Sequence, residues 1–78
     1  MTSQNTVSLP TIRRQAESVS PHGWYVILSD DINRWSKTTG VYATIEQCYV
    51  EARQIVARQF QIPADARIVD FHGEWPVA

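Results

Sequence analysis

Hydrophobic and polar positions along the chain predict three strands. Residues 24–29 (WYVILS) are almost all apolar and rich in aromatic and β-branched side chains, as buried strands are. Residues 34–43 alternate in character and follow a turn sequence at 30–33 (DDIN), so we expect them to form a hairpin with the first strand. Residues 67–72 (RIVDFH) form the third predicted strand, which Gly73 ends.

A longer pattern with helical spacing follows the hairpin and predicts a helix over residues 44–62. Thr44 and Gln47 match a capping box, in which the threonine hydroxyl accepts from a helical amide and the glutamine side chain reaches back. Pro63 ends the helix, because proline lacks the N–H that would continue it. The apolar side chains cover an arc of about 140°, which suits one core-facing stripe. They are Ile45, Cys48, Tyr49, Ala52, Ile55, Val56 and Phe60.

The N-terminal part has a weaker pattern, and we expect residues 1–20 to be a flexible or partly helical arm. Ile12, Ala16 and Val19 have the spacing of one side of a short helix that Pro21 would end. An extended arm lying along the domain is the main alternative. Residues 21–78 then form a single α+β domain, in which a small antiparallel sheet packs on one long amphipathic helix. The sheet consists of the hairpin and the third strand, and the predicted order is (α)ββαβ.

Composition and charge narrow the classes of function. Hydrophobic residues make up 44% of the chain and charged residues 19%, which is too apolar for a disordered protein. Seven basic residues stand against eight acidic ones, so a nucleic-acid partner is unlikely on electrostatic grounds. No apolar run reaches the ~18 residues of a membrane span. Cys48 is the single cysteine, which excludes an internal disulfide and fits a cytoplasmic location.

Candidate chemistry is sparse. Asp70, His72 and Glu74 would share one face of a strand, where they could form a weak metal site or an acid–base pair. Gly73 interrupts that strand, so a solvated strand end is the favoured interpretation. Cys48 lies on the apolar stripe of the predicted helix, which indicates a buried structural thiol. We therefore predict no catalytic residues, no metal site and no cofactor.

The aromatic content exceeds what one small core needs. One helix covers one face of a sheet, so if Trp24, Val26 and Leu28 face the helix, Tyr25 and Ile27 are left on the open face. An exposed apolar patch on a small domain usually marks an interface. The predicted partner-binding residues are Tyr25, Ile27, Arg34, Trp35, Lys37, Tyr42 and Trp75.

The function predicted from these observations is a small non-enzymatic protein–protein interaction domain. It would be a self-associating module, with a homodimer as a plausible form, or an inhibitor or adaptor of the kind that phages and mobile elements carry. One alternative is a nucleic-acid-binding module that uses the open sheet face. Another is a small enzyme or ligand carrier with a site near Asp70 and His72.

Overall fold

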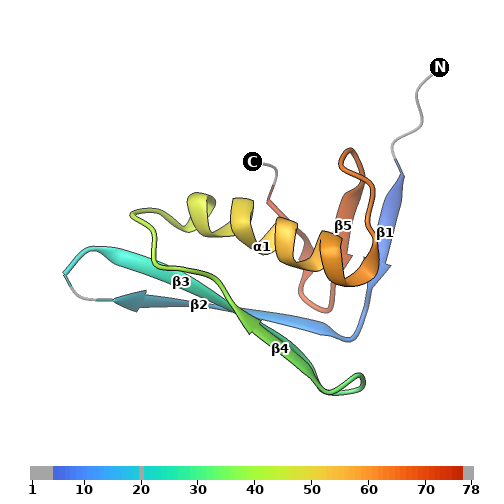
Figure 1. The fold of residues 1–78 in the computed structure, drawn as a ribbon, viewed down its shortest axis with the longest axis horizontal. Coiled ribbons are helices and arrows are strands. Elements are labelled where there is room, and N and C mark those ends of the chain that lie inside the picture. The colour runs from blue at the N-terminus through green and yellow to red at the C-terminus, as the bar shows by residue number, and fades with distance from the viewer. Residues whose placement is uncertain (1–4, 20, 77–78) are drawn as a thin grey trace.

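The computed structural model describes residues 5–19 and 21–76, which form two three-stranded sheets and one helix (Figure 1). The α+β class predicted from the sequence is confirmed. The elements are β1 (Thr6–Leu9), β2 (Ile12–Val19), β3 (Gly23–Asp30), β4 (Trp35–Thr38), α1 (Ile45–Phe60), β5 (Arg67–Asp70) and β6 (Gly73–Glu74). One sheet has the order β2-β3-β4 and the other β1-β5-β6. Figure 1 shows α1 lying over the first sheet, with β1 and β5 at the C-terminal end of the helix.

The helix begins as the sequence predicts. The Thr44 hydroxyl accepts from the Gln47 amide at 3.2 Å, and the Gln47 side chain accepts from the Thr44 amide at 3.1 Å, which completes the capping box. Cys48, Ala52 and Val56 are fully buried, so the predicted stripe faces the core. The helix ends at Phe60, because Gln61 adopts a left-handed conformation with φ 55°.

The predicted hairpin is β3 and β4, joined by a turn that Asp30 organises. Its carboxylate accepts from the amides of Ile32 and Asn33, each at 3.1 Å, and from the Asn33 side chain at 2.7 Å. The Asn33 hydrogen bond is the main reason that the pKa of Asp30 lies below its usual 3.8. The turn ends at Arg34, which has φ 53°.

A bulge separates β4 from the segment that follows it. Ile27 pairs with Thr38, and Trp24 pairs with Tyr42. Between these two pairs the chain advances three residues on β3 but four residues on the opposite segment. One extra residue therefore lies between these pairs, close to Gly40. Because one added residue reverses the alternation, Tyr42 shares the helix-facing side with Trp24.

The N-terminal segment is not helical at residues 12–19, and the prediction of a helix there is wrong. These residues form β2, which pairs antiparallel with β3 along its whole length, from Ile12 opposite Asp30 to Val19 opposite Gly23. The extended alternative is closer to the structure. The local spacing of apolar residues resembled a helix, but pairing with a buried neighbouring strand determines the outcome.

The third predicted strand, β5, belongs to the other sheet and does not pair with the hairpin. It pairs in parallel with β1 and antiparallel with β6. Gly73 opens β6 with φ 117°, a conformation that suits glycine. Trp75 follows, donates its amide to the Ile68 carbonyl at 2.8 Å and is 5% exposed, so the segment after Gly73 contributes to the core.

Candidate interaction surface

The sheet β2-β3-β4 has one face covered by α1 and another that the helix does not reach. On β3, Val26 and Leu28 point toward the helix and are fully buried, whereas Tyr25 and Ile27 point the other way and are half-buried. Residues opposite each other in an antiparallel pair share a face, so Glu17 lies beside Tyr25 and Gln15 beside Ile27. We call this side of the sheet the open face. Its described members are Arg13, Gln15, Glu17, Val19, Tyr25, Ile27, Ser29, Ser36, Thr38 and Val41.

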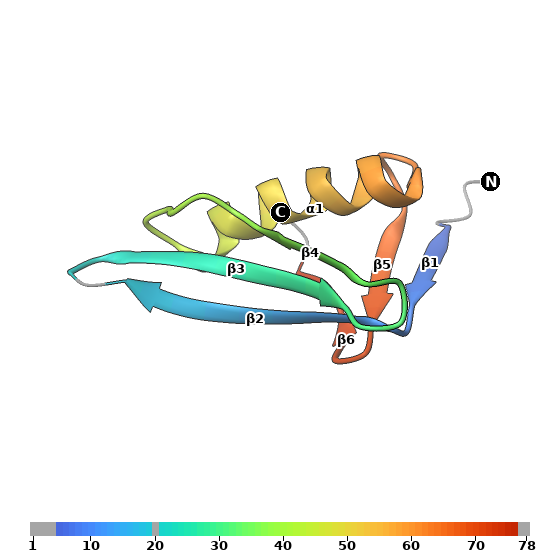
Figure 2. The same ribbon diagram turned by 60° about the horizontal axis from the view of Figure 1, so that its bottom comes forward.

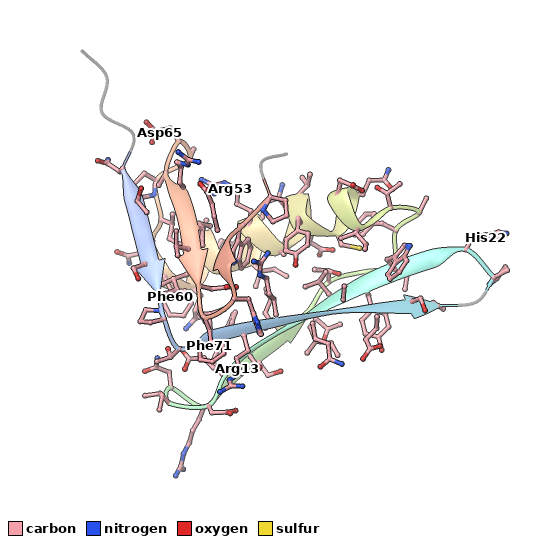
Figure 3. The ribbon with its side chains drawn as sticks, turned by 180° about the vertical axis from the view of Figure 1, so that it is seen from behind. Arg13, His22, Arg53, Phe60, Asp65 and Phe71 are labelled. Carbon is pink, nitrogen blue, oxygen red and sulfur yellow. The ribbon has the colours of Figure 1, made fainter. Side chains whose placement is uncertain are left out.

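Apolar side chains lie toward both ends of the open face. Near one end, Val41 is 60% exposed and approaches Gly23 so closely that a Cβ there would lie 2.8 Å from the valine Cγ1. At the other end, Phe71 is 58% exposed, and the Arg13 guanidinium lies 4.6 Å from its ring centre (Figure 3). Sequence reasoning missed these residues because the bulge after β4 and the turn after β5 place them there, and the local pattern shows neither.

Strand β2 forms one margin of this sheet (Figure 2). Trp24 and Tyr42 exchange both backbone hydrogen bonds, at 2.8 and 2.9 Å, so the backbone groups of Trp24 point toward the β4 side. The groups of Tyr25 therefore point toward β2 and meet those of Glu17. By the same alternation, the backbone groups of Arg14, Ala16 and Ser18 point away from β3. We call this row of outward groups the β2 edge.

The β2 edge is engaged at its start. The Phe71 amide donates to the Ile12 carbonyl at 3.3 Å, which agrees with an outward direction for even-numbered residues. Among residues 5–19 and 21–76, no strand pairs with β2 on this side. Ala16 and Ser18, farther along, are exposed.

The structure brings together only some of the predicted partner-binding residues. Tyr25 and Ile27 lie side by side on the open face, as expected. Arg34 and Lys37 are exposed, but Lys37 pairs with Leu28 and so belongs to the helix-facing side. Trp35 also lies on that side, where its ring packs edge-on against Phe60 at 5.6 Å between centroids.

Tyr42 and Trp75 are not on the open face. The Tyr42 hydroxyl donates to the Glu51 carboxylate of α1 at 2.9 Å, and this bond is the main cause that raises the pKa of Tyr42 above its usual 10.0. The same Glu51 oxygen accepts from the Gly40 amide at 2.8 Å, so this contact fixes the bulge to the helix. Trp75 packs edge-on against Tyr49 in the core. These positions correct the expectation that both rings would face a partner.

The polar residues at the end of β5, which the sequence offered as a possible metal or acid–base site, make structural contacts instead. The Asp70 carboxylate is buried and lies 2.9 Å from the Arg14 guanidinium. It also accepts from the Trp75 indole N–H and from the His72 amide, each at 2.7 Å. The His72 side chain is exposed in the turn between β5 and β6, and Glu74 pairs with Arg67. Asp70 therefore links β2 to β5 and Trp75, and the predicted shared face of Asp70, His72 and Glu74 does not form.

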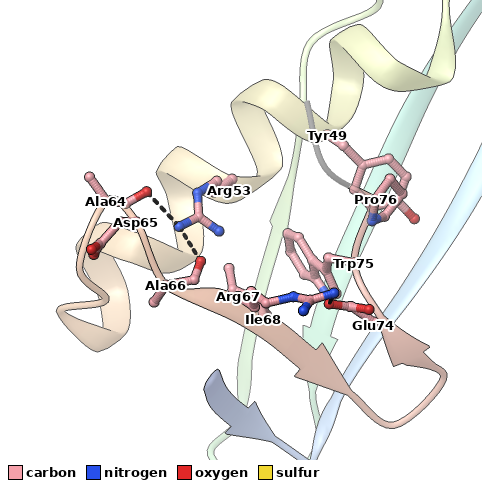
Figure 4. Close-up of a pocket in the computed structure, with 10 residues that line it drawn as sticks. All are labelled: Tyr49, Arg53, Ala64, Asp65, Ala66, Arg67, Ile68, Glu74, Trp75 and Pro76. Atoms are coloured by element: carbon pink, nitrogen blue, oxygen red, sulfur yellow. Dashed lines mark hydrogen bonds and ion pairs between the residues drawn. The ribbon is translucent and has the colours of Figure 1, made fainter. Parts of the chain in front are cut away.

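A hollow of about 520 Å³ lies between α1 and the β5–β6 hairpin (Figure 4). Tyr49 and Trp75 form its aromatic wall. Arg53 reaches across from the helix and donates one guanidinium nitrogen to the carbonyls of Ala64 and Ala66, at 2.9 and 2.6 Å. The guanidinium of Arg53 is thus bound by carbonyls of the loop that follows the helix. We interpret the hollow as a result of this anchoring of the loop to the helix.

Comparison with known proteins adds no relative: no family model, no curated protein and no solved structure matches this chain. Within the described ranges, no group of three or more His, Cys, Asp or Glu side chains is placed to hold a metal ion. No helix in that part of the chain is both long enough and apolar enough to cross a bilayer.

Proposed function

We propose that this protein is a non-enzymatic protein-interaction domain that binds another polypeptide through the open face of the β2-β3-β4 sheet. The single observation that carries the proposal is the one-sided cover of this sheet. Helix α1 buries Val26 and Leu28 on one side, while Tyr25 and Ile27 remain half-exposed on the other. Uncovered apolar and aromatic side chains on a small domain are typical of interfaces.

The distribution of polar groups supports a protein partner. Gln15, Glu17 and Thr38 border Tyr25 and Ile27, so an aromatic and aliphatic centre has a polar rim, as interfaces commonly do. The free cysteine, Cys48, is buried, and we propose a reducing cytoplasmic setting for it.

The basic residues favour a protein partner over a nucleic acid. Arg14 is paired with Asp70 inside the molecule, Arg67 with Glu74, and Arg53 with loop carbonyls. The open face itself carries Arg13 together with Glu17 and lacks the basic excess that phosphate binding needs. These pairings leave fewer cations for phosphate contacts and so argue against the nucleic-acid alternative.

Site-specific photo-crosslinking in the native cells tests the proposal. A benzoylphenylalanine in place of Tyr25 should form a covalent adduct with a protein, because Tyr25 lies on the open face of the central strand β3. The matched control carries the same group in place of Val50, which is 45% exposed on α1 and lies away from this face. We expect a discrete adduct from position 25 and none from position 50.

Two results would contradict the proposal. Absence of an adduct at position 25 would show that the open face does not bind a protein. Equal adducts at positions 25 and 50 would show that the capture is unspecific. A position-25 adduct that nuclease treatment destroys would instead support the nucleic-acid alternative. As a second variant, Tyr25→Ser with Ile27→Ser should abolish partner capture at other open-face positions while the helical circular dichroism signal is retained.

A further inference from the structure

The β2 edge has a hydrogen-bonding pattern that a second copy of the same strand can satisfy. We infer that β2 of one chain pairs antiparallel with β2 of a second copy, about a two-fold axis at Ala16. This inference goes beyond the proposed function, because self-pairing uses the margin of the sheet and leaves its open face uncovered. Two-fold dimers are also the commonest form of homo-oligomer.

The backbone geometry selects residues that can face each other. In an antiparallel pair, residues whose N–H and C=O groups point toward the partner must stand opposite one another. On the β2 edge these residues are Arg14, Ala16 and Ser18, as the alternation from the Trp24–Tyr42 pair requires. With the axis at Ala16, this residue meets itself, and Arg14 meets Ser18 of the second copy. Every outward group along these three residues then has a partner.

The neighbouring registers are less favourable. An axis at Gln15 would place Ser18 of the second copy opposite Ile12, whose carbonyl already accepts from the Phe71 amide. An axis at Glu17 would place two like carboxylates directly opposite each other, which destabilises a strand pair. The Ala16 axis avoids both problems.

The side chains along the edge are compatible with this approach. Ala16 and Ser18 are small, so they leave room on the helix-facing side. Arg14 does not obstruct that side, because its guanidinium folds back to Asp70 at 2.9 Å. On the open face, Gln15 meets Glu17 of the second copy, and Arg13 lies diagonally from the same carboxylate. Arg13 and Glu17 therefore bring opposite charges together in both halves of the pair, while Gln15 already donates to Glu17 of its own chain.

The strand also lacks three of the features that can interrupt pairing at an edge, namely proline, glycine and a bulge. Its eight residues (IRRQAESV) contain no proline or glycine, and they pair with β3 in unbroken register without a bulge. Self-pairing would cover this edge and join the two open faces into one continuous surface. Tyr25 and Ile27 of both copies would then lie on the same side of a single extended sheet.

A mixed disulfide tests the register. Gln15 and Glu17 of the second copy form a pair without backbone hydrogen bonds, whose Cα atoms stand about 4.5 Å apart, within disulfide range. We expect that mixing the full chains Gln15→Cys and Glu17→Cys under mild oxidation gives the mixed disulfide at least about tenfold faster than either variant gives its own. The wild-type chain, whose Cys48 is buried, is the control and should give no dimer band. Faster self-linking of either variant, or no linking in the mixture, would overturn the Ala16 axis.

A proline variant tests the hydrogen bonds. Ala16→Pro removes an outward N–H without touching the β2–β3 ladder, and Ala16→Val keeps that N–H at the same site. We expect the proline variant to weaken dimerisation by about tenfold or more in sedimentation equilibrium, with the helical signal intact, and the valine variant to dimerise like the wild type. Equal dissociation constants, or a wild-type chain that stays monomeric at millimolar concentration, would overturn self-pairing. A monomer that still forms the protein adduct at position 25 would leave the proposed function standing, because that function depends on the open face and not on the β2 edge.

Discussion

Removal of the Asp70 carboxylate should be the most damaging single change outside the apolar core. Asp70→Ala leaves the Arg14 guanidinium, whose side chain is 13% exposed, without its counter-ion. It also leaves the Trp75 indole N–H and the His72 amide without their acceptor. Breaking a buried ion pair from one side costs about 3–5 kcal/mol, because an uncompensated charge stays behind.

The expected cost is a large part of the total stability. A chain of 78 residues at about 0.05–0.15 kcal/mol per residue has a free energy of unfolding of roughly 4–12 kcal/mol. Urea denaturation followed by circular dichroism, at a concentration below dimerisation, measures the loss through the shift of the midpoint. Asp70→Asn is the matched control, since its amide oxygen can still accept one of the two N–H groups and the loss should be smaller.

A double-mutant cycle separates the ion pair from the other contacts. Arg14→Met combined with Asp70→Asn should cost at least about 1 kcal/mol less than the sum of the two single changes, because neither charge is left alone. His72→Ala should be neutral, since the Asp70 contact uses its backbone amide. An Asp70→Ala loss below about 1 kcal/mol, or an additive cycle, would refute the structural role of this carboxylate.

Three further changes test other parts of the fold. Gly73→Ala should destabilise by about 1–3 kcal/mol in urea, because alanine is strained at φ 117°; an unchanged midpoint would contradict that backbone conformation. Thr39→Val removes the hydroxyl that accepts from the buried Val26 amide at 2.9 Å and should cost about 1–3 kcal/mol in the same assay, whereas Thr39→Ser should be close to neutral. Because its pKa is raised, the protonated Tyr42 hydroxyl stabilises the folded state fully below pH 10.0, and this stabilisation is lost as pH rises through the folded-state pKa. Tyr42→Phe should therefore lose less stability than the wild type across that alkaline range. Parallel pH profiles of the two proteins would argue against the bond to Glu51.

The sequence was sufficient to predict those elements for which local signals and the pattern of burial agree. The capping box at Thr44 and Gln47, the apolar stripe that follows it and the continuous apolar run of β3 each specify an element without help from distant residues. The Asp30 turn is largely local, because three of its hydrogen bonds come from Ile32 and Asn33, and only the bond from Thr11 crosses 19 residues of sequence. These elements were therefore predictable in type and approximate extent.

The remaining elements depend on long-range pairing. β1 has only four residues and forms its sheet with β5, which lies about sixty residues later in the chain, where Thr6 pairs with Arg67. β2 reads locally like a weak helix because Ile12, Ala16 and Val19 have helical spacing. Strand pairing with a buried neighbour outweighs such weak propensities.

The candidate surface was partly predictable for the same reason. Tyr25 and Ile27 follow from strict alternation within β3, whose register has no interruption. Tyr42 was misplaced because the bulge near Gly40 reverses the alternation after β4. The buried position of Trp75 depends on Asp70, which accepts its indole N–H. This contact requires β6 to pair antiparallel with β5, and the local sequence does not show that pairing.

Amide hydrogen exchange at several protein concentrations tests the pairing of the β2 edge most directly. The amides of Gln15 and Glu17 point to β3 and should be protected at every concentration. The amides of Ala16 and Ser18 point outward and should exchange quickly in dilute solution, then slow as the concentration rises and the second copy covers them. Fast exchange at Ala16 and Ser18 that does not change with concentration would contradict the self-pairing of this strand.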